Sequence, residues 1–313
     1  MAPPTAFGAD STALDVVDGV DLLGRAAIVT GGSAGIGVET ARALAHAGAA
    51  VTLAVRDVEA GRRAAVDIRR SSPGATVHVR TLDLADPGSV GRFTEDWTGP
   101  LHLLVNNAGV MMTPELRTPQ GWELQFATNH LGHFALATGL HRALAAAGGA
   151  RIVSVSSSGH GSSDIAYDDL FFDRRPYDAG HAYGQSKTAN VLFAVEATQR
   201  WAEDGVTANA VMPGGVWTGL QRHWDPEELA ATKARVAAQG FTVKTPAQGA
   251  ATSVFAATSP LLEGLGGRYF EDCREADVVP AIVDGLHGVR DYALDPVSAR
   301  RLWEVSLGIL AGA

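Results

Sequence analysis

The sequence is poor in cysteine, lysine and basic charge. Its 313 residues contain one cysteine, Cys273, which cannot form a disulfide within the chain and therefore favours a reducing compartment, the cytoplasm. Lys and Arg together number 25 against 34 Asp and Glu, and a net charge of −9 argues against sequence-independent binding of nucleic acid. Lysines stand at three positions only, Lys187, Lys233 and Lys244, so a lysine in this chain indicates a specific chemical need.

Long hydrophobic runs and an export signal are also missing. No stretch of about 18 residues is continuously apolar, which predicts the absence of a membrane span. The first positive charge is Arg25, behind four aspartates, so the start of the chain lacks the charge pattern of a signal or transit peptide. With 46% hydrophobic and 19% charged residues, the composition is typical of a soluble globular protein.

Apolar runs alternate with helical patterns along most of the chain. The runs lie near 26–30, 50–55, 76–82, 101–105, 150–156 and 206–212, and the helical patterns near 35–47, 58–70, 87–97, 119–147 and 182–203. Strands this apolar have no face in water, which predicts a parallel sheet covered by helices on both sides. We therefore expect one doubly wound α/β domain over 25–313, preceded by a leader with a short helix over 1–24.

The segment 215–245 departs from this alternation. It carries Trp217, Trp224 and Phe241 among charged helix formers, and it follows the last predicted strand. Ligands of open α/β sheets bind at the carboxyl ends of the strands. We expect 215–245 to form a mobile helical lid with its rings toward the substrate and polar residues such as Arg222 on the outer face. A rigid helical pair packed on the sheet is the alternative.

A glycine-rich turn follows the first predicted strand. Gly31 permits a tight turn, Gly35 lets backbone N–H groups approach a pyrophosphate, and Gly37 allows the next helix to pack closely. This strand, turn and helix predict a Rossmann-type, dinucleotide-binding sheet, although a glycine-rich turn without a ligand has the same pattern. The other candidate cofactor contacts in the turn are Ser33, Ala34 and Ile36.

The second predicted strand ends in an arginine rather than in a carboxylate. An acidic residue there would bind the 2′-hydroxyl of an NAD ribose, whereas Arg56 would pair with the 2′-phosphate of NADP(H), which we expect as the cofactor. Asp57 is the reservation, but it also suits the cap of the next helix. Asp83, followed by Leu84, ends the third strand and is a candidate acceptor for the adenine amino group, with a helix cap as the alternative.

Tyr183 and Lys187 stand one helical turn apart in a strongly helical stretch, so their side chains share one face. A free phenol has a pKa of about 10 and is a poor acid-base catalyst at neutral pH. An ammonium group beside it would lower that pKa toward the working range. A tyrosine and a lysine packed on a solvated helix face are the plainer interpretation, but the scarcity of lysine favours the catalytic one.

Five motifs in order resemble those of the short-chain dehydrogenase/reductase family. They are Thr30–Gly37, Asn106–Gly109, Ser156–Ser157, Tyr183 with Lys187, and Pro213–Gly214. The runs 129–134, 151–157 and 267–273 are similar to the branch that holds retinol dehydrogenases and the WW-domain oxidoreductase. The resemblance implies a homodimer or homotetramer that transfers hydride between NADP(H) and a small ketone, aldehyde or alcohol, which is expected to be apolar.

The same resemblance implies a role for each motif residue. Tyr183 is the general acid-base, and Lys187 lowers its pKa and binds the nicotinamide ribose. Ser157 binds the substrate carbonyl oxygen, in competition with three neighbouring serines, and Asn129 holds a water that connects Lys187 with solvent. The remaining cofactor contacts that the resemblance implies are Asn107, Ala108, Gly109, Pro213, Gly214, Val216 and Thr218.

Two other functions fit the same motifs. A catalytically silent dinucleotide-binding protein is one, although it would have no chemical reason to keep all four catalytic residue types in place. A double-bond reductase similar to protochlorophyllide reductase is the other, because it shares the tyrosine and lysine and differs mainly in substrate.

Four histidines are weighed separately. His130 and His133 stand at helical spacing, but no carboxylate or third ligand is nearby in the sequence, so we expect packing and capping rather than a metal site. His160 and His181 flank the predicted active site and are candidates for contact with substrate.

Overall fold

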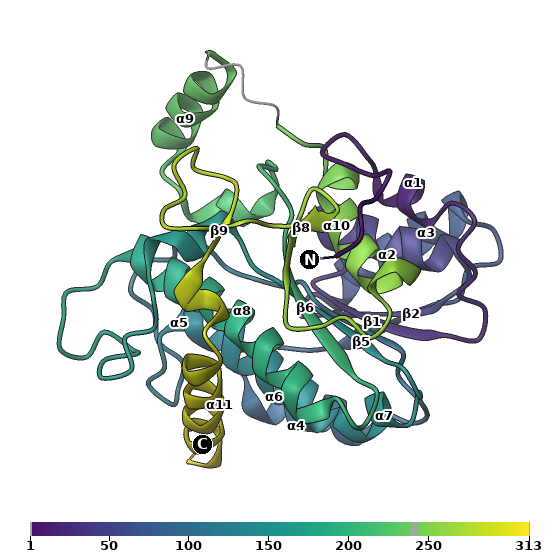
Figure 1. The fold of residues 1–313 in the computed structure, drawn as a ribbon, viewed down its shortest axis with the longest axis horizontal. Coiled ribbons are helices and arrows are strands. Elements are labelled where there is room, and N and C mark those ends of the chain that lie inside the picture. Colours follow the sequence, from purple (N-terminus) through teal and green to yellow (C-terminus); the bar gives the residue numbers. More distant parts are fainter. Residues whose placement is uncertain (1, 239–242, 313) are drawn as a thin grey trace.

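One eight-stranded sheet forms the centre of the computed structural model, which describes residues 2–238 and 243–312 (Figure 1). The strand order is β3-β2-β1-β4-β5-β6-β7-β8, and only β8 at the edge is antiparallel to its neighbour. The order reverses between β1 and β4, which confirms the doubly wound α/β fold. The strands are β1 (Ala26–Thr30), β2 (Ala50–Val55), β3 (Val77–Thr81), β4 (Leu103–Asn106), β5 (Arg151–Val155), β6 (Thr207–Met212), β7 (Tyr269–Glu271) and β8 (Arg274–Glu275).

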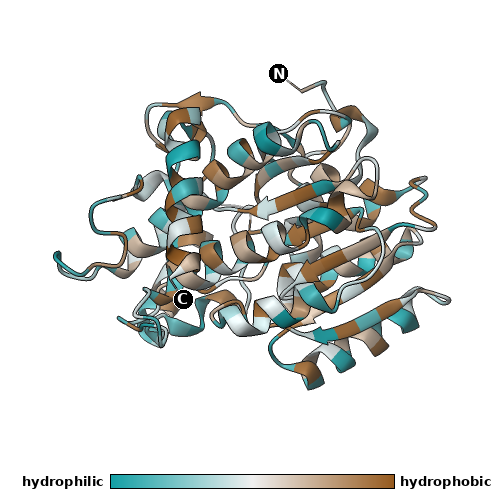
Figure 2. Ribbon diagram, turned by 90° about the horizontal axis from the view of Figure 1, so that it is seen from below, coloured by the Kyte–Doolittle hydropathy of each residue, from teal (hydrophilic) through white to brown (hydrophobic). Residues whose placement is uncertain are grey.

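Helices cover both faces of the sheet, and each layer encloses its own apolar core. Successive residues of β1 point to opposite faces, so Val29 belongs to one core and Ile28 to the other. Figure 2 shows the apolar strands between the helices. One layer contains α1 (Ala13–Val17), α2 (Gly35–His46), α3 (Val58–Ser71) and α10 (Pro246–Thr258); the other contains α4 (Pro87–Glu95), α6 (Gly132–Gly139), α7 (His141–Ala145), α8 (Ala179–Trp201) and α11 (Pro296–Ala311).

The leader packs against this domain rather than standing apart from it. Thr12 caps α1, which is shorter than a full two turns, and Ala13, Val16 and Val17 are buried. Helix α1 lies against α10, so two neighbouring helices of this layer come from segments far apart in the chain. No helix in the described residues has both the length and the apolar character needed to cross a bilayer.

The expectation of one continuous helix over 119–147 is wrong. The chain forms α5 (Leu124–Phe126), a π-helical turn η1 (Ala127–Leu131), and then α6 and α7. The buried carboxylate of Glu123 accepts hydrogen bonds from the backbone N–H groups of Gln125 and Phe126, which fixes where the helix begins. A π turn widens the helix and often marks a functional position. In this chain it contains Asn129.

The segment 215–245 contains a 3₁₀ turn, η3 (Gly219–His223), and helix α9 (Pro226–Ala238). Figure 1 shows α9 projecting beyond the carboxyl edge of the sheet, and none of its described residues is buried. Asp225 caps α9 through the backbone N–H groups of Glu227 and Glu228. Phe241, which was expected to face the substrate, lies outside the described residues.

The contact between α6 and the loop after β3 leads to a stability prediction. A Cβ at Gly132 would lie 2.2 Å from the backbone oxygen of Leu84, and that backbone cannot move aside as a flexible side chain can. Gly132→Ala should therefore lower the free energy of unfolding in urea by about 1–3 kcal/mol, the usual cost of overpacking.

The matched control is Gly308→Ala in α11, where an added Cβ would meet nothing within 4 Å. Because alanine favours a helix more than glycine does, this variant should gain about 0.5–1 kcal/mol. Equal stability of the two variants would contradict the tight packing of α6 on Leu84.

Candidate active site

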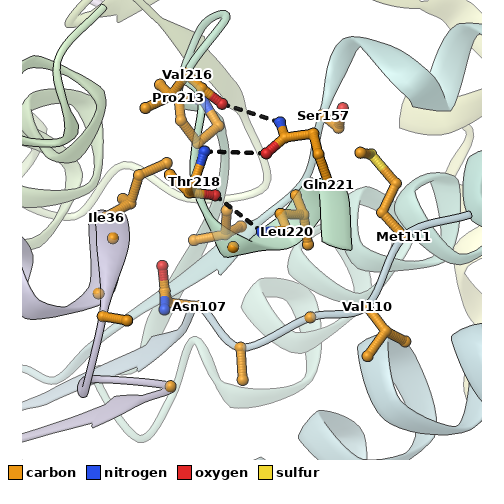
Figure 3. Close-up of a pocket in the computed structure, with 18 of the residues that line it drawn as sticks. Ile36, Asn107, Val110, Met111, Ser157, Pro213, Val216, Thr218, Leu220 and Gln221 are labelled. Atoms are coloured by element: carbon orange, nitrogen blue, oxygen red, sulfur yellow. Dashed lines mark hydrogen bonds between the residues drawn. The ribbon is translucent and has the colours of Figure 1, made fainter. Parts of the chain in front are cut away.

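A cavity of about 930 Å³ opens at the carboxyl ends of the central strands. Every catalytic and cofactor-binding residue that the sequence analysis assigned lines it except Asn129, and the substrate candidates His160 and His181 do not. Figure 3 shows side chains from the glycine turn, the loop after β4, Ser157 and the segment after β6 around one hollow. The lining residues in common are Gly31, Ser33, Ala34, Gly35, Ile36, Gly37, Arg56, Asp83, Leu84, Asn107, Ala108, Gly109, Ser157, Tyr183, Lys187, Pro213, Gly214, Val216 and Thr218.

The glycine turn has no room for side chains. Gly31 and Gly35 have φ values of 65° and 57°, a backbone conformation that side chains disfavour. A Cβ on Gly37 would lie 2.4 Å from the backbone oxygen of Gly31. Thr218, from the segment after β6, lies directly beside Gly35. The turn therefore presents backbone at the first turn of α2, as an anion site requires.

A hydrogen-bond network joins this turn to the loop after β4. The hydroxyl of Thr30 accepts hydrogen bonds from the backbone N–H groups of Asn107 and Ala108, both at 2.9 Å. Burial lowers the pKa of His133 to about 4, so its ring is neutral and carries one proton. That proton is on Nδ1, because Nδ1 lies 2.9 Å from the carbonyl oxygen of Asn129, which can only accept. Nε2 then accepts from the Thr30 hydroxyl at 2.8 Å.

Asn129 supports the site from behind the cavity wall. Its Nδ2 donates to the backbone oxygen of Val110 and to the hydroxyl of Ser186, both at 2.9 Å, and its Oδ1 accepts from the N–H of Val110. Both amide protons are therefore used within the protein. The side chain of Asn129 therefore positions the Val110 loop and α8. That Asn129 holds a water connecting Lys187 with solvent stays a prediction.

The remaining histidines have structural environments. His130 is buried, its Nε2 lies 2.8 Å from the hydroxyl of Ser306, and burial lowers its pKa to about 3. The expectation that His160 touches substrate is wrong: the ring is fully buried, lies outside the cavity lining and accepts from the N–H of Arg290. His181 is exposed and also lies away from the cavity. The described residues hold no group of three or more metal-ligating side chains.

Tyr183 and Lys187 lie in the first turns of α8, with the Lys187 Nζ 5.6 Å from the centre of the phenol ring. Burial raises the pKa of Tyr183 to about 12, and the Ser157 hydroxyl lowers it only in part. Burial also lowers the pKa of Lys187 to about 8. Desolvation therefore dominates the pKa values of both groups and favours their neutral forms. The expected lowering of the tyrosine pKa by Lys187 stays a prediction.

The local chain explains why Ser157, and not its neighbours, is beside the phenol. The hydroxyl of Ser156 donates to the backbone oxygen of Lys187, and Ser154 is buried within β5. Ser157 caps the 3₁₀ turn η2 (Ser158–Ser162), where its hydroxyl accepts from the N–H of Gly159. A Cβ on Gly159 would lie 2.8 Å from the Tyr183 ring, so this position has to be glycine for the phenol to reach Ser157.

Two arginines converge at the opposite end of the cavity. Arg56 directly follows β2, and Arg222 reaches the lining from η3 while its side chain stays exposed, as expected. Burial, and then the charge of Arg56, lower the pKa of Arg222. Asp57 is the cap of α3, where its carboxylate accepts from the N–H of Ala60 at 2.9 Å. Sequence analysis missed Arg222 as a candidate cofactor contact because 166 positions of chain separate it from Arg56, whose charge acts on it.

Asp83 also lines the cavity, and it is not the cap of α4. Asp86 caps that helix by accepting from the N–H of Gly88, whereas Asp83 accepts from the N–H of Ala85 in the loop before it. The alternative that Asp83 is a plain helix cap is therefore wrong.

The segment after β6 forms a folded rim over the cavity. Thr218 and Gln221 form a capping box, and the side-chain amide of Gln221 donates to the backbone oxygen of Val216 at 3.0 Å (Figure 3). Trp217 and Trp224 line the cavity, as expected. Lys233 lies 5.4 Å from the ring of Trp217, so α9 holds this ring from outside.

A nucleotide-sized cavity with a glycine turn at one end and a buried tyrosine beside a lysine at the other is typical of nicotinamide-dependent oxidoreductases. Comparison with known proteins narrows this class to a family. The family model described as short chain dehydrogenase matches residues 25–229. The chain belongs to the short-chain dehydrogenase/reductase family and is an oxidoreductase, as its motifs predicted.

Individual relatives agree with this assignment. The chain is 51% identical over 300 residues to a Streptomyces antibioticus protein named "Probable oxidoreductase". The alignment covers 94% of this chain and 100% of the relative. It is 42% identical over 296 residues to retinol dehydrogenase 11 of Mus musculus, and the alignment covers 93% of this chain and 88% of the relative. This similarity confirms the expected branch of the family. The structure of 3-oxoacyl (acyl-carrier-protein) reductase from Agrobacterium tumefaciens C58 with NADP bound is similar at a TM-score of 0.64 and 26% identity. The match covers 80% of this chain and 93% of that one.

The low pKa of Lys187 can be measured directly, because the chain has three lysines only. NMR of isotope-labelled lysine should show one side chain that is charged below about pH 8 and neutral above it, against about 10.4 for an ordinary lysine. Lys187→Met should remove this signal and leave the other two. A Lys187 signal that stays charged up to about pH 10 would contradict its burial.

Proposed function

We propose that the protein is an NADP(H)-dependent oxidoreductase that reduces apolar ketones or aldehydes and oxidises the corresponding alcohols. The observation that carries this proposal is the Tyr183 phenol, which burial keeps protonated beside the Ser157 hydroxyl at one end of the cavity. A phenol that holds its proton at neutral pH is suited to donate it to a developing alkoxide.

Three features of the cavity fit NADP(H). The glycine turn offers backbone N–H groups at the start of α2, where a pyrophosphate is stabilised. Arg56 and Arg222 concentrate positive charge in the same lining, which suits the 2′-phosphate that distinguishes NADP(H) from NAD(H). The residues proposed for the rest of the cofactor are Asp83, Leu84, Asn107, Ala108, Gly109, Pro213, Gly214, Val216 and Thr218.

The proposed chemistry divides between cofactor and protein. When bound, the nicotinamide supplies or accepts the hydride. Ser157 donates a hydrogen bond to the substrate oxygen and so orients it toward Tyr183, whose phenol oxygen releases or takes the proton. Lys187 is within reach of both the tyrosine and the cavity, where its ammonium form stabilises the phenolate that is left behind.

The lining of the substrate end favours an apolar compound. Met111, Trp217, Leu220 and Leu286 contribute apolar surface to the cavity. The indole N–H of Trp224 is buried and has no hydrogen-bond partner among the described residues, so it is available to a polar group of the substrate. We propose that 215–245 closes over the substrate as a lid. The homodimer or homotetramer that the family suggests stays a prediction.

Removal of one hydroxyl group tests the proposed acid. Tyr183→Phe should lower kcat for ketone reduction by a factor of about 10² or more, because the proton donor is lost while the ring still fills its place. The affinity for NADPH, measured by fluorescence titration, should change by less than about threefold, since the phenol contributes a proton and little binding energy.

Tyr167→Phe is the matched control for this change. The Tyr167 hydroxyl bonds to Ser298 and lies outside the cavity lining, so its loss should leave kcat near the wild-type value. Full activity of Tyr183→Phe would refute the assignment. A wild-type enzyme that reduces activated carbon–carbon double bonds but no ketone or aldehyde would favour the double-bond reductase instead.

Replacement of the two arginines tests the cofactor. A charge-assisted pair with a phosphate is worth about 1.5–3 kcal/mol, so Arg56→Gln should weaken NADPH binding by roughly one to two orders of magnitude and leave NADH binding almost unchanged. Arg222→Gln should have the same direction of effect. Arg63→Gln on the exposed face of α3 is the control and should change neither affinity. Equal wild-type affinities for NADPH and NADH would overturn the NADP(H) assignment.

A further inference from the structure

Lys244 is a buried lysine for which the proposed chemistry has no use. Its side chain is 7% exposed and forms an ion pair with Asp272, whose side chain is 12% exposed. Removing one partner of a buried ion pair leaves the other charge without compensation, so such a pair strongly fixes the segments that carry it. Asp272 follows β7 and has a φ of 46°, so its position at the turn is fixed by its surroundings as well.

Lys244 holds one wall of the cavity. A Cβ on Gly214 would lie 2.8 Å from Cδ of Lys244, so the lysine stem packs directly on the backbone that follows Pro213. The backbone N–H of Lys244 donates to the oxygen of Gly215 at 2.9 Å, and Val216 pairs with Lys244 in a parallel bridge. Lys244 is thus attached by main chain and side chain to the loop that starts the lid.

Asp272 holds the opposite wall through a histidine. Its second carboxylate oxygen lies 3.3 Å from Nε2 of His287, and Nδ1 of His287 lies 2.6 Å from the carboxylate of Asp284. Asp284 also accepts from the backbone N–H groups of Leu286 and His287, which closes the loop on itself. Asp284, Gly285 and Leu286 line the cavity.

We propose that Lys244, Asp272 and His287 form a clamp between the loop at Gly214 and the loop at 284–286, and that this clamp sets the size of substrate that the cavity admits. The inference rests on the proposed function for its substrate class. All three are positioning residues, because none is assigned contact with the reacting atoms. The two walls come from chain segments 70 residues apart, and the ion pair and its histidine connect them.

The charges around His287 favour the protonated form of its ring, and with it the contact between His287 and Asp272 that completes the clamp. Burial disfavours a charged ring, but the carboxylates of Asp284, Glu271 and Asp272 outweigh burial and raise the pKa of His287. Glu271 is itself buried and accepts from the N–H of Gly288. The cations nearby are Lys244, which is paired with Asp272, and Arg274 on β8, which acts on Glu271.

Kinetics with a series of ketones of increasing bulk test the clamp. Lys244→Met keeps most of the unbranched side chain and removes its charged end, so the walls should separate. The ratio of kcat/KM for the bulkiest over the smallest ketone should rise by about tenfold, through KM, with kcat for the smallest ketone changed by less than about threefold. Lys244→Arg keeps the charge and should restore the wild-type ratio at least in part.

Two further variants guard against a general loss of structure. Asp272→Asn removes the other charge and suits the left-handed backbone at this position, so it should reproduce the effect of Lys244→Met even where that variant folds poorly. Arg268→Met is the matched control, because it breaks an ion pair with Glu275 next to the same strand but outside the cavity lining. An unchanged size ratio in both clamp variants, or the same change in Arg268→Met, would overturn the proposal.

Hydrogen exchange separates failure of the clamp from failure of the proposed function. In Lys244→Met, amides of 214–216 and 285–288 should exchange at least about tenfold faster than in wild type, while amides of β5 should not change. If wild-type protein reduces no carbonyl compound, the proposed function fails, and this measurement still decides the clamp. Unchanged exchange in both loops would show that Lys244 does not connect them.

Discussion

The site depends on the hydrogen bonds of one hydroxyl group at the end of β1. Thr30 accepts from two backbone N–H groups of the loop after β4 and donates to His133 at the start of α6. This hydroxyl therefore joins the end of β1 to the loop after β4 and to the helix that follows the π turn. Asn107 completes the contact by donating to the backbone oxygen of Thr30, and its amide would collide with any Cβ on Gly37. The network requires a neutral His133, because a ring charged at both nitrogens would leave the Thr30 hydroxyl facing a donor.

Burial acts on Tyr183 and Lys187 in opposite directions for one reason. Moving either group out of water penalises its charged form, so the pKa of the phenol rises and the pKa of the ammonium falls. Attraction between phenolate and ammonium opposes both shifts, but it matters only when both are charged. At neutral pH the phenol of the protein therefore carries its proton, and only the ammonium form of Lys187, present below about pH 8, can stabilise the phenolate once that proton has left.

Sequence analysis predicted the parts of the fold that one strong signal determines. Strands β1, β2, β4, β5 and β6 were found because they are buried on both faces and read as apolar runs. Strand β3 lies at the edge of the sheet and is only partly buried, and its Val-His-Val-Arg pattern is shorter and less apolar. The glycine turn was found because its backbone excludes side chains. The break at Ala127–Leu131 was not, since a π turn leaves the helical pattern of apolar residues intact. Strands β7 and β8 contain three and two residues, too few for a periodic pattern to appear.

Among the site residues, too, those with a strong local signal could be placed from the sequence and those without one could not. Motif residues next to strand ends could be placed from sequence, because parallel strands bring their carboxyl ends to one edge. Arg222, Lys244 and His287 could not, since their partners lie on segments remote in the chain and no local pattern connects them. The end of the cavity at the glycine turn is consequently made of backbone that few substitutions can change without loss of fold, whereas the proposed substrate end also depends on side chains held by ion pairs. Substrate selection can therefore change by substitution at the second end while the nucleotide end stays as it is.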